Sequence, residues 1–311
     1  MAVKLKDLSK KKDLLAGGHR ACAGCGPAIL LRQATLAVDD PQVVSFATGC
    51  MEVVTTIYPY TAWRIPYIHN AFENSASTMS GVEAAYQSLK KQGKLPVDKD
   101  IKFIAYGGDG GTYDIGLQAL SGAMERGHDM LYICYDNEGY MNTGIQRSSA
   151  TPFAAATTTA PAGSKVPGKT QFNKDLTAIM AAHHIPYVAQ TAIHSWRDVV
   201  EKVRKAVSIK GPTFINVLAP CHRGWRFPME KTIEITKLAV ETCFWPLYEV
   251  EDGKYTVKKP KEKKPIEEWL KPQGRYKHIF KDENKHLIEE MQAHIDKLWE
   301  DLLKKEKLSE E

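Results

Sequence analysis

Two short segments rich in glycine and acidic residues each follow a strand-like run of the chain. The run 101–106 leads into 107–111 (GGDGG) and then into a helical segment. Glycines at such a turn let backbone N–H groups approach an anion closely, and the start of a helix favours negative charge. The run 130–135 leads into 136–139 (DNEG), which offers further oxygen ligands. Phosphate groups beside the Asp109 carboxylate need a bridging cation, for which Mg²⁺ is suited. A tight turn without a ligand is the alternative for GGDGG alone.

Four of the six cysteines lie where metal ligands are expected. Cys22 and Cys25 form a Cys-X-X-Cys pair in a glycine-rich loop, and Cys50 and Cys221 each follow a strand-like run. These positions are compatible with convergence at one edge of a sheet. Four thiolates suit a [4Fe–4S] cluster or a structural zinc, and one close pair with two distant single residues favours the cluster. A thioredoxin-like redox pair is a third interpretation, which the flanking pattern does not support.

Strand-like and helical segments alternate along the chain. The strand-like runs are 43–48, 101–106, 130–135, 185–191 and 213–218. The helical segments begin after Pro27 and continue with 75–91, 115–126, 174–183 and 196–207. This alternation predicts an α/β fold with a mainly parallel sheet and helices on both faces. Ligands of such folds bind beyond the carboxyl ends of the strands, where GGDGG and DNEG lie.

The pattern changes after residue 245, which predicts two parts. We expect a cofactor-binding domain at 1–245 and a charged arm at 246–311. In the arm, Asp252-Gly253 predicts a hairpin turn. An amphipathic helix is expected at about 283–305, packed on this chain or on a neighbour, with apolar positions Leu287, Met291, Ile295, Leu298 and Leu302. Segment 151–170 lacks any hydrophobic period, so it is expected to be a functional or mobile loop.

Composition excludes several classes of protein. The formal net charge of +5 comes mainly from lysines near the two ends, so nucleic-acid binding is not expected. No apolar run reaches the roughly 18–20 residues that span a bilayer, and no signal peptide is visible, so the chain is expected to be cytoplasmic. Cysteines in that compartment serve metal binding or redox chemistry more often than disulfides. Cys134 and Cys243 stand in apolar runs and are expected to be buried thiols.

Taken together, these motifs closely resemble the β subunit of multi-subunit pyruvate:ferredoxin oxidoreductases, within the 2-oxoacid:ferredoxin oxidoreductase family. The resemblance covers about residues 16–245, in order, through many specific segments. The matching segments are AGGHRACAGCG (16–26), ATGCMEVVTTIYPYTAW (47–63), HNAFENSAS (69–77), GGDGGTYDIGLQALSGAMERGHD (107–129), YDNEGYMNTGIQRS (135–148) and GPTFINVLAPCHRGWR (211–226). The resemblance implies a thiamine diphosphate-binding fold.

The resemblance also implies which residues hold the cofactors. In thiamine diphosphate enzymes an Asp, an Asn and a backbone carbonyl two residues on hold Mg²⁺ against the diphosphate. The matching groups are Asp109, Asn137 and the Gly139 carbonyl, although Asp-Asn replaces the commoner Asn-Asn. The family's cysteines that ligate one [4Fe–4S] cluster match Cys22, Cys25, Cys50 and Cys221, which favours the cluster over zinc. The implied cofactor contacts are Cys50, Gly108, Asp109, Gly110, Gly111, Asn137, Glu138, Gly139, Tyr140, Met141 and Asn142.

The implied activity is the oxidative decarboxylation of a 2-oxoacid. Pyruvate would give acetyl-CoA and CO₂, with electrons passing through the cluster to ferredoxin. Asn142 is the expected catalytic side chain, in contact with the substrate, and its alternative role is to cap a turn. The expected partners are other subunits of the same enzyme, one of them ferredoxin-like and one supplying the glutamate that activates the aminopyrimidine. Glu73 is interpreted as structural.

The substrate and two other functions stay open at this point. Tyr113 and the segment 221–226 (CHRGWR) depart from many relatives, and neither change touches a cofactor ligand. Branched-chain 2-oxoacids, 2-oxoglutarate and oxalate are therefore alternatives to pyruvate. A thiamine decarboxylase or synthase without redox function is a second alternative, which the four cysteines argue against. An iron–sulfur electron carrier without thiamine is a third, which GGDGG and DNEG argue against.

Overall fold

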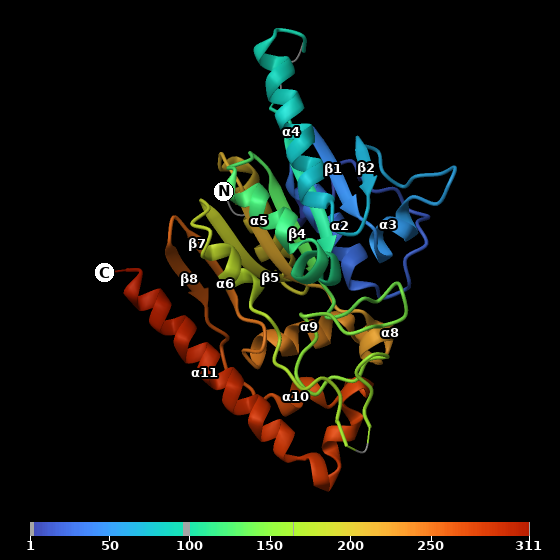
Figure 1. The fold of residues 1–311 in the computed structure, drawn as a ribbon, viewed down its shortest axis with the longest axis vertical. Helices are drawn as coiled ribbons and strands as arrows, with labels where there is room; N and C mark the ends of the chain where they lie inside the picture. Colours follow the sequence, from blue (N-terminus) through green and yellow to red (C-terminus); the bar gives the residue numbers. More distant parts are fainter. Residues whose placement is uncertain (1–2, 96–99, 164, 311) are drawn as a thin grey trace.

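The computed structural model describes residues 3–95, 100–163 and 165–310, which are built around one eight-stranded sheet (Figure 1). The strand order is β2-β1-β3-β4-β6-β5-β7-β8. The strands are β1 (Gln42–Ala47), β2 (Tyr67–Asn70), β3 (Lys102–Gly108), β4 (Leu131–Asp136), β5 (Tyr187–Ala192), β6 (Thr213–Leu218), β7 (Leu247–Glu251) and β8 (Lys254–Lys258). Neighbouring strands from β2 to β5 are parallel, and β7 and β8 are added antiparallel. The predicted mainly parallel sheet is confirmed.

The helices are distributed over both faces of the sheet and over one edge. They are α1 (Leu5–Leu8), α2 (Gly26–Ala37), α3 (Cys50–Thr55), α4 (Ser75–Lys91), α5 (Leu117–Glu125), α6 (Leu176–Ala181), α7 (Trp196–Ser208), α8 (His222–Trp225), α9 (Thr232–Glu241), α10 (Glu267–Leu270) and α11 (His286–Leu308). Shorter turns are η1 (Gly110–Ile115), η2 (Met229–Lys231), η3 (Gly274–Phe280) and η4 (Asp282–Asn284). None of the described helices is long and apolar enough to cross a membrane.

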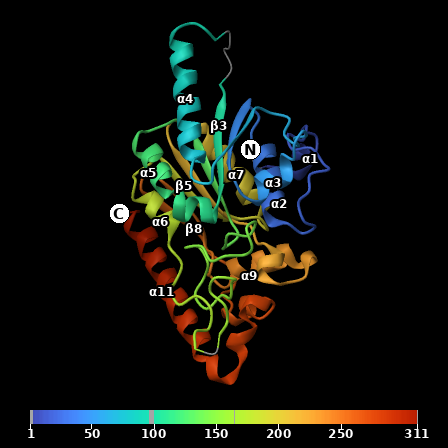
Figure 2. The same cartoon turned by 45° about the vertical axis from the view of Figure 1, so that its right-hand side comes forward.

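Side chains of the central strands alternate between the two faces of the sheet and form two cores, one on each face. On β4, Ile133 and Tyr135 pack in the core formed with α2 and α7. Tyr132 and Cys134, between and beside them in sequence, pack in the core formed with α4, α5 and α6. Successive side chains of a strand point to opposite faces, so a strand buried on both sides is apolar throughout. Figure 2 shows α2 and α7 on the opposite side of the sheet from α5 and α6.

A third core lies beyond the carboxyl ends of the strands. It joins α8 and α9 to α10, η3 and α11, and it includes Trp225, Trp245 and Trp269. In Figure 1 these elements form the orange and red layer below the sheet. The segment after residue 245 thus contributes both to the sheet, through β7 and β8, and to the layer that covers the strand ends. The division of the chain at residue 245 stays a prediction.

The hairpin and final helix predicted for this segment are present. β7 and β8 pair around Asp252 and Gly253, which have φ angles of 46° and 85°. Two residues with positive φ are typical of a hairpin turn that follows the strand twist. Four of the five apolar positions expected in α11 are buried against this chain, but Leu298 is 48% exposed because it borders an open cavity beside the helix. Packing of Leu298 on a neighbouring chain stays a prediction.

Candidate functional site

Two predicted oxygen ligands meet at the carboxyl ends of β3 and β4. Asp109 follows β3, Asn137 follows β4, and the two strands are neighbours in the sheet. The side-chain amide of Asn137 lies 2.9 Å from the Gly139 carbonyl oxygen and 3.0 Å from Asp109 Oδ1. The Asn137 amide is therefore within hydrogen-bonding distance of both other groups that were predicted to hold a cation.

The distances from the Asn137 amide to the other two groups fit Mg²⁺ as well as they fit hydrogen bonds. Octahedral Mg²⁺, with bonds of about 2.1 Å, separates neighbouring oxygen ligands by about 3.0 Å. With its nitrogen turned inward, the Asn137 amide donates to Gly139 and Asp109. Rotation of the Asn137 amide by 180° instead brings its oxygen to the same two oxygen atoms. Three oxygen atoms so close together are favourable when a cation lies between them. The residues present thus fit an ion held by one carboxylate, one amide oxygen and one backbone carbonyl.

Asp109 is a buried carboxylate in an acidic environment. It is 1% exposed, and burial together with the Asp136 carboxylate raises its pKa well above the ordinary value. Ser148 Oγ donates to Asp109 Oδ2 at 2.5 Å, and the Asn137 N–H donates to Oδ1 at 3.3 Å. These two bonds favour the charged form and offset part of the cost of burial. A cation beside Asp109 would favour the charged form further.

A narrow cleft lies beside the oxygen groups. Its lining comes from the ends of β1, β3 and β4 and from Phe72, which follows β2: Thr48, Gly49, Cys50, Phe72, Gly108, Asp109, Gly110, Gly111, Tyr135, Asn137, Gly139, Tyr140, Met141, Asn142 and Thr143. A Cβ atom on Gly110 would lie 2.4 Å from the Tyr140 ring, and one on Gly111 would lie 2.9 Å from the Phe72 carbonyl oxygen. Glycine is required at both positions because a side chain would displace the wall of the cleft.

The cleft occupies the position where ligands of open α/β sheets are usually bound. β1 and β3 are adjacent, and from β1 the chain proceeds to β2 on the outer side. The order of the strands therefore reverses between β1 and β3, and the crevice outside their carboxyl ends is the usual ligand site. Cys50 lies beyond the end of β1 and Asp109 beyond the end of β3. The two predicted sites, thiol and oxygen, thus flank one crevice.

The four predicted thiol ligands come from three loops at this edge of the sheet. Cys25 precedes α2, Cys50 begins α3, and Cys221 precedes α8. Burial, together with the neighbouring thiols Cys221, Cys25 and Cys22, raises the pKa of Cys50 to about 12. Burial is also the main cause that raises the pKa of Cys25 to about 12. The effect of the other thiols on the pKa of Cys50 indicates that the four thiols lie near one another. A coordinated metal would lower these pKa values, because metal-bound thiols are deprotonated.

Hydrogen bonds fix the Cys-X-X-Cys loop against the loop that carries Cys221 and against the start of α9. The Gly26 N–H donates to the Pro220 carbonyl at 3.2 Å. Thr232 Oγ1 donates to the Gly24 carbonyl at 2.6 Å. Gly24 has a φ of 73°, and a Cβ atom there would lie 2.3 Å from the Met229 carbonyl oxygen. This loop can therefore approach its neighbour only with glycine at position 24.

The Tyr135 side chain lies against both of the glycines that precede Cys50 and Asp109. A Cβ atom on Gly49 would lie 2.8 Å from the Tyr135 hydroxyl, and one on Gly108 would lie 3.0 Å from the Tyr135 ring. Asp109 contributes to the raised pKa of Cys50. In the part of the chain that the structure describes, no three His, Cys, Asp or Glu side chains lie close enough to hold a single metal ion.

The two remaining cysteines are buried, as the sequence predicted. Cys134 and Cys243 are both buried among apolar side chains, 0% and 4% exposed. Glu73 is exposed and does not line the cleft. Of the described residues that line the cleft, Asp109 is the only carboxylate.

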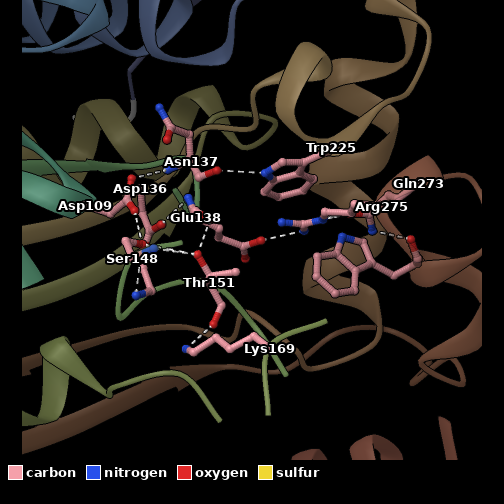
Figure 3. Close-up of polar contacts among 12 residues, drawn as sticks. Asp109, Asp136, Asn137, Glu138, Ser148, Thr151, Lys169, Trp225, Gln273 and Arg275 are labelled. Carbon is pink, nitrogen blue, oxygen red and sulfur yellow. Dashed lines mark hydrogen bonds and ion pairs between the residues drawn. The ribbon is translucent and has the colours of Figure 1, made fainter. Parts of the chain in front are cut away.

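Several residues at the site carry no local sequence signal for their contacts. Trp225 Nε1 donates to the Asn137 carbonyl at 2.7 Å, and Thr151 Oγ1 donates to the Glu138 carbonyl at 2.7 Å. Figure 3 shows the Glu138 side chain directed toward Arg275 of η3, and it does not line the cleft. Trp225 stands in the segment 211–226 that matched the family, which was the one available hint. Thr151 begins the segment predicted as a functional or mobile loop.

Comparison with known proteins agrees with this geometry. The family described as thiamine pyrophosphate enzyme, C-terminal TPP binding domain, matches residues 47–217. Pyruvate synthase subunit PorB of Thermotoga maritima is 52% identical over 320 residues, covering 100% of this chain and 99% of the relative. PorB of Methanocaldococcus jannaschii is 58% identical, covering 92% and 95%. Ketoisovalerate oxidoreductase subunit VorB of Pyrococcus abyssi is 45% identical, covering 92% and 91%.

A solved structure agrees in fold. The 2-oxoglutarate:ferredoxin oxidoreductase from Magnetococcus marinus, with 2-oxoglutarate, coenzyme A and succinyl-CoA bound, superposes with a TM-score of 0.55. The match has 17% identity and covers 76% of this chain and 80% of that chain, so it shows a common fold. By its full-length identity to the curated relatives and its match to the thiamine pyrophosphate-binding domain, the chain belongs to the family of pyruvate synthase PorB subunits, the β subunits of 2-oxoacid:ferredoxin oxidoreductases.

Proposed function

We propose that this chain is the thiamine diphosphate-binding subunit of a pyruvate synthase, which converts pyruvate and CoA to acetyl-CoA and CO₂ and passes the electrons to ferredoxin. One observation carries the proposal: the oxygen group suited to Mg²⁺ and Cys50 line the same cleft, and the other three predicted thiols are near enough to influence the pKa of Cys50. A decarboxylase without redox function has no use for the thiols, and an electron carrier has no use for the oxygen group.

The chain's own residues would bind and orient the cofactor. Asp109, Asn137 and the Gly139 carbonyl would hold Mg²⁺, which in turn neutralises the diphosphate. Gly110 and Gly111 keep the backbone clear of side chains along the cleft. When bound, thiamine diphosphate supplies the nucleophilic carbon that attacks the 2-oxo group and accepts the electrons left when CO₂ departs. Asn142 lines the same cleft and would donate a hydrogen bond to the substrate.

The four thiols would hold one [4Fe–4S] cluster. Cys22, Cys25, Cys50 and Cys221 supply the ligand number of such a cluster, and Cys50 also lines the cofactor cleft. The closeness of the thiols to the cofactor cleft would suit transfer of electrons, one at a time, from the cofactor to the cluster. A cluster of several irons also spans a wider opening than a single zinc ion, which suits thiols that come from three separate loops.

Other subunits would complete the active site. Asp109 faces the metal position, and it is the one carboxylate among the described residues of the cleft, so the glutamate that activates the aminopyrimidine would come from a partner chain. We infer that a ferredoxin-like subunit or free ferredoxin receives the electrons. The chain by itself is therefore expected to bind the cofactors without turning over substrate.

The test is a cofactor and turnover analysis of the complex assembled with its partner subunits. Iron, acid-labile sulfide and thiamine are measured together, and reduction of ferredoxin is followed with pyruvate and CoA. The expected result is one cluster's worth of iron from this chain, bound thiamine, and reduction that needs both pyruvate and CoA. Turnover by the isolated chain, or a complex that lacks either cofactor, would refute the proposal.

Branched-chain 2-oxoacids are the second candidate substrate. The relative named ketoisovalerate oxidoreductase subunit VorB is 45% identical, close to the identity of several PorB relatives. Competition between pyruvate and 3-methyl-2-oxobutanoate in the same ferredoxin assay separates the two. A higher kcat/KM for the branched acid would transfer the assignment to that substrate.

A further inference from the structure

The backbone between Asn137 and Gly139, the two cation-binding residues that follow β4, has a conformation that needs support. Glu138 separates Asn137 from Gly139, and it has a φ of 63°. A left-handed residue there turns the chain, so that the Asn137 side chain and the Gly139 carbonyl lie 2.9 Å apart. Residues other than glycine adopt this conformation at an energetic cost. The conformation therefore persists only where surrounding contacts impose it. Something must therefore hold Glu138.

Three polar contacts hold Glu138, and one comes from the C-terminal part of the chain. Its N–H donates to Asp136 Oδ1 at 2.9 Å, and its carbonyl accepts from Thr151 Oγ1 at 2.7 Å. Its carboxylate pairs with Arg275 Nη2 at 2.5 Å, and the two side chains are 1% and 2% exposed. The ion pair joins residues 137 positions apart in sequence (Figure 3).

Arg275 also supports the other side of the same loop. Its guanidinium lies 3.9 Å from the centre of the Trp225 ring, and Trp225 Nε1 donates to the Asn137 carbonyl at 2.7 Å. Arg275 is itself fixed, because its Nε donates to Gln273 Oε1 at 2.9 Å. One side chain thus contacts Glu138 directly and Asn137 through Trp225, with little freedom to move.

We propose that Arg275 is a positioning residue of the cofactor site, which holds Glu138 in the left-handed conformation and so sets the Asn137 side chain and the Gly139 carbonyl for Mg²⁺. This inference rests on the metal site of the proposed function. It gives the C-terminal segment a part in cofactor binding, although no residue of that segment lines the cleft among the described residues. Arg275 acts on the affinity for Mg²⁺ and not on the chemistry of the substrate.

The test measures the Mg²⁺ concentration needed for thiamine diphosphate binding to the full chain, by titration calorimetry. Arg275→Met is expected to raise the half-saturating Mg²⁺ concentration at least about tenfold, as loss of a supporting contact does at other metal sites. Ile279→Ala is the matched control, because Ile279 is buried in the same η3 turn and its apolar side chain forms no ion pair with Glu138. It should lower the unfolding temperature and leave the Mg²⁺ dependence unchanged.

Two double variants separate backbone positioning from loss of charge. Arg275→Met with Glu138→Gly should regain most of the Mg²⁺ affinity, because glycine adopts positive φ without strain. Arg275→Met with Glu138→Ala also removes the unpaired carboxylate but keeps the strain, and it should remain impaired. Equal Mg²⁺ dependence of the two double variants would overturn the inference even if Arg275→Met alone does not fold. Unchanged Mg²⁺ dependence in a folded Arg275→Met would overturn it too, whereas Mg²⁺-independent binding by the unaltered chain would instead refute the proposed metal site.

Discussion

Replacement of Asp109 by asparagine should separate the stability of the chain from its capacity to bind cofactor. Burial and the Asp136 carboxylate raise the pKa of Asp109 well above its ordinary value. A carboxyl whose pKa is higher in the folded state than in the unfolded state destabilises the fold increasingly as pH rises from the unfolded pKa through the folded pKa. Asparagine has no charge to bury, and its oxygen can still accept from Ser148. Its amide nitrogen cannot accept from the Asn137 N–H, but this lost bond is long, at 3.3 Å, and costs less than the buried charge. At neutral pH and without metal, Asp109→Asn should therefore be at least as stable as the unaltered chain.

The effect on cofactor binding has the opposite sign. Thiamine diphosphate at 100 times its dissociation constant, with saturating Mg²⁺, should stabilise the unaltered chain by about 2.7 kcal/mol. Asp109 is the only carboxylate of the three metal-binding groups, so its loss should cost no less than the roughly 100-fold upper range for supporting residues. The same cofactor concentration then equals one dissociation constant, which leaves a stabilisation of only about 0.4 kcal/mol.

The assay is urea unfolding of the full chain at neutral pH, with and without thiamine diphosphate and Mg²⁺. Asp129→Asn is the matched control, because Asp129 pairs with Lys210 at the opposite, amino-terminal end of β4. This control should retain the full cofactor-dependent stabilisation. If Asp109→Asn gained as much stability from the cofactor as the unaltered chain, Asp109 would not be a ligand and the proposed Mg²⁺ site would be wrong.

Two further predictions concern the thiol group. Cys50→Ser should lower the iron content of the anaerobically purified chain and slow electron transfer to ferredoxin. Its control is Cys134→Ala, which alters a buried thiol of the core with α4, α5 and α6 and should keep its iron. A full iron content in Cys50→Ser would contradict the proposed ligand set. Gly24→Ala should also lose iron, because its φ of 73° and the 2.3 Å approach of a Cβ atom to the Met229 carbonyl both oppose a side chain. Gly17→Ala, with open space around it, should have normal iron content, and equal iron in the two glycine variants would show that the loop geometry does not matter.

The sequence by itself determined the architecture and the location of the site. All the parallel strands except β2 are short, apolar and bounded by polar residues, a local pattern that requires no knowledge of distant contacts. The strand β2 was not predicted, because its sequence YIHN is short and mixed in polarity. Because the carboxyl ends of parallel strands meet at one edge, the positions of Asp109 and Asn137 directly after two such strands were enough to predict that they lie together. The cysteines Cys50 and Cys221 follow strands for which the same argument holds. Their role as cluster ligands came from the family resemblance and remains a proposal.

Details of the helices depended on packing that local pattern does not encode. The helix expected at 115–126 begins instead as the π-helical turn η1 at Gly110 and continues as α5 from Leu117. Glycines in this turn allow the wider winding, and such turns are common at functional sites. Leu298 matched the apolar spacing of α11, yet it borders an open cavity, because spacing specifies a face of the helix and not what covers it.

Only the tertiary structure decided how the metal-binding loop is held. Glu138 stands next to two predicted ligands, and from sequence it was expected to contact the cofactor. In the fold, its carboxylate turns away from the cleft to Arg275, 137 positions along the chain. A buried ion pair is formed only because the layer of α8, α10 and η3 closes over the strand ends and excludes water from both charges. A pairing between distant residues depends on the way the whole chain packs, so no local pattern of residues could have predicted it.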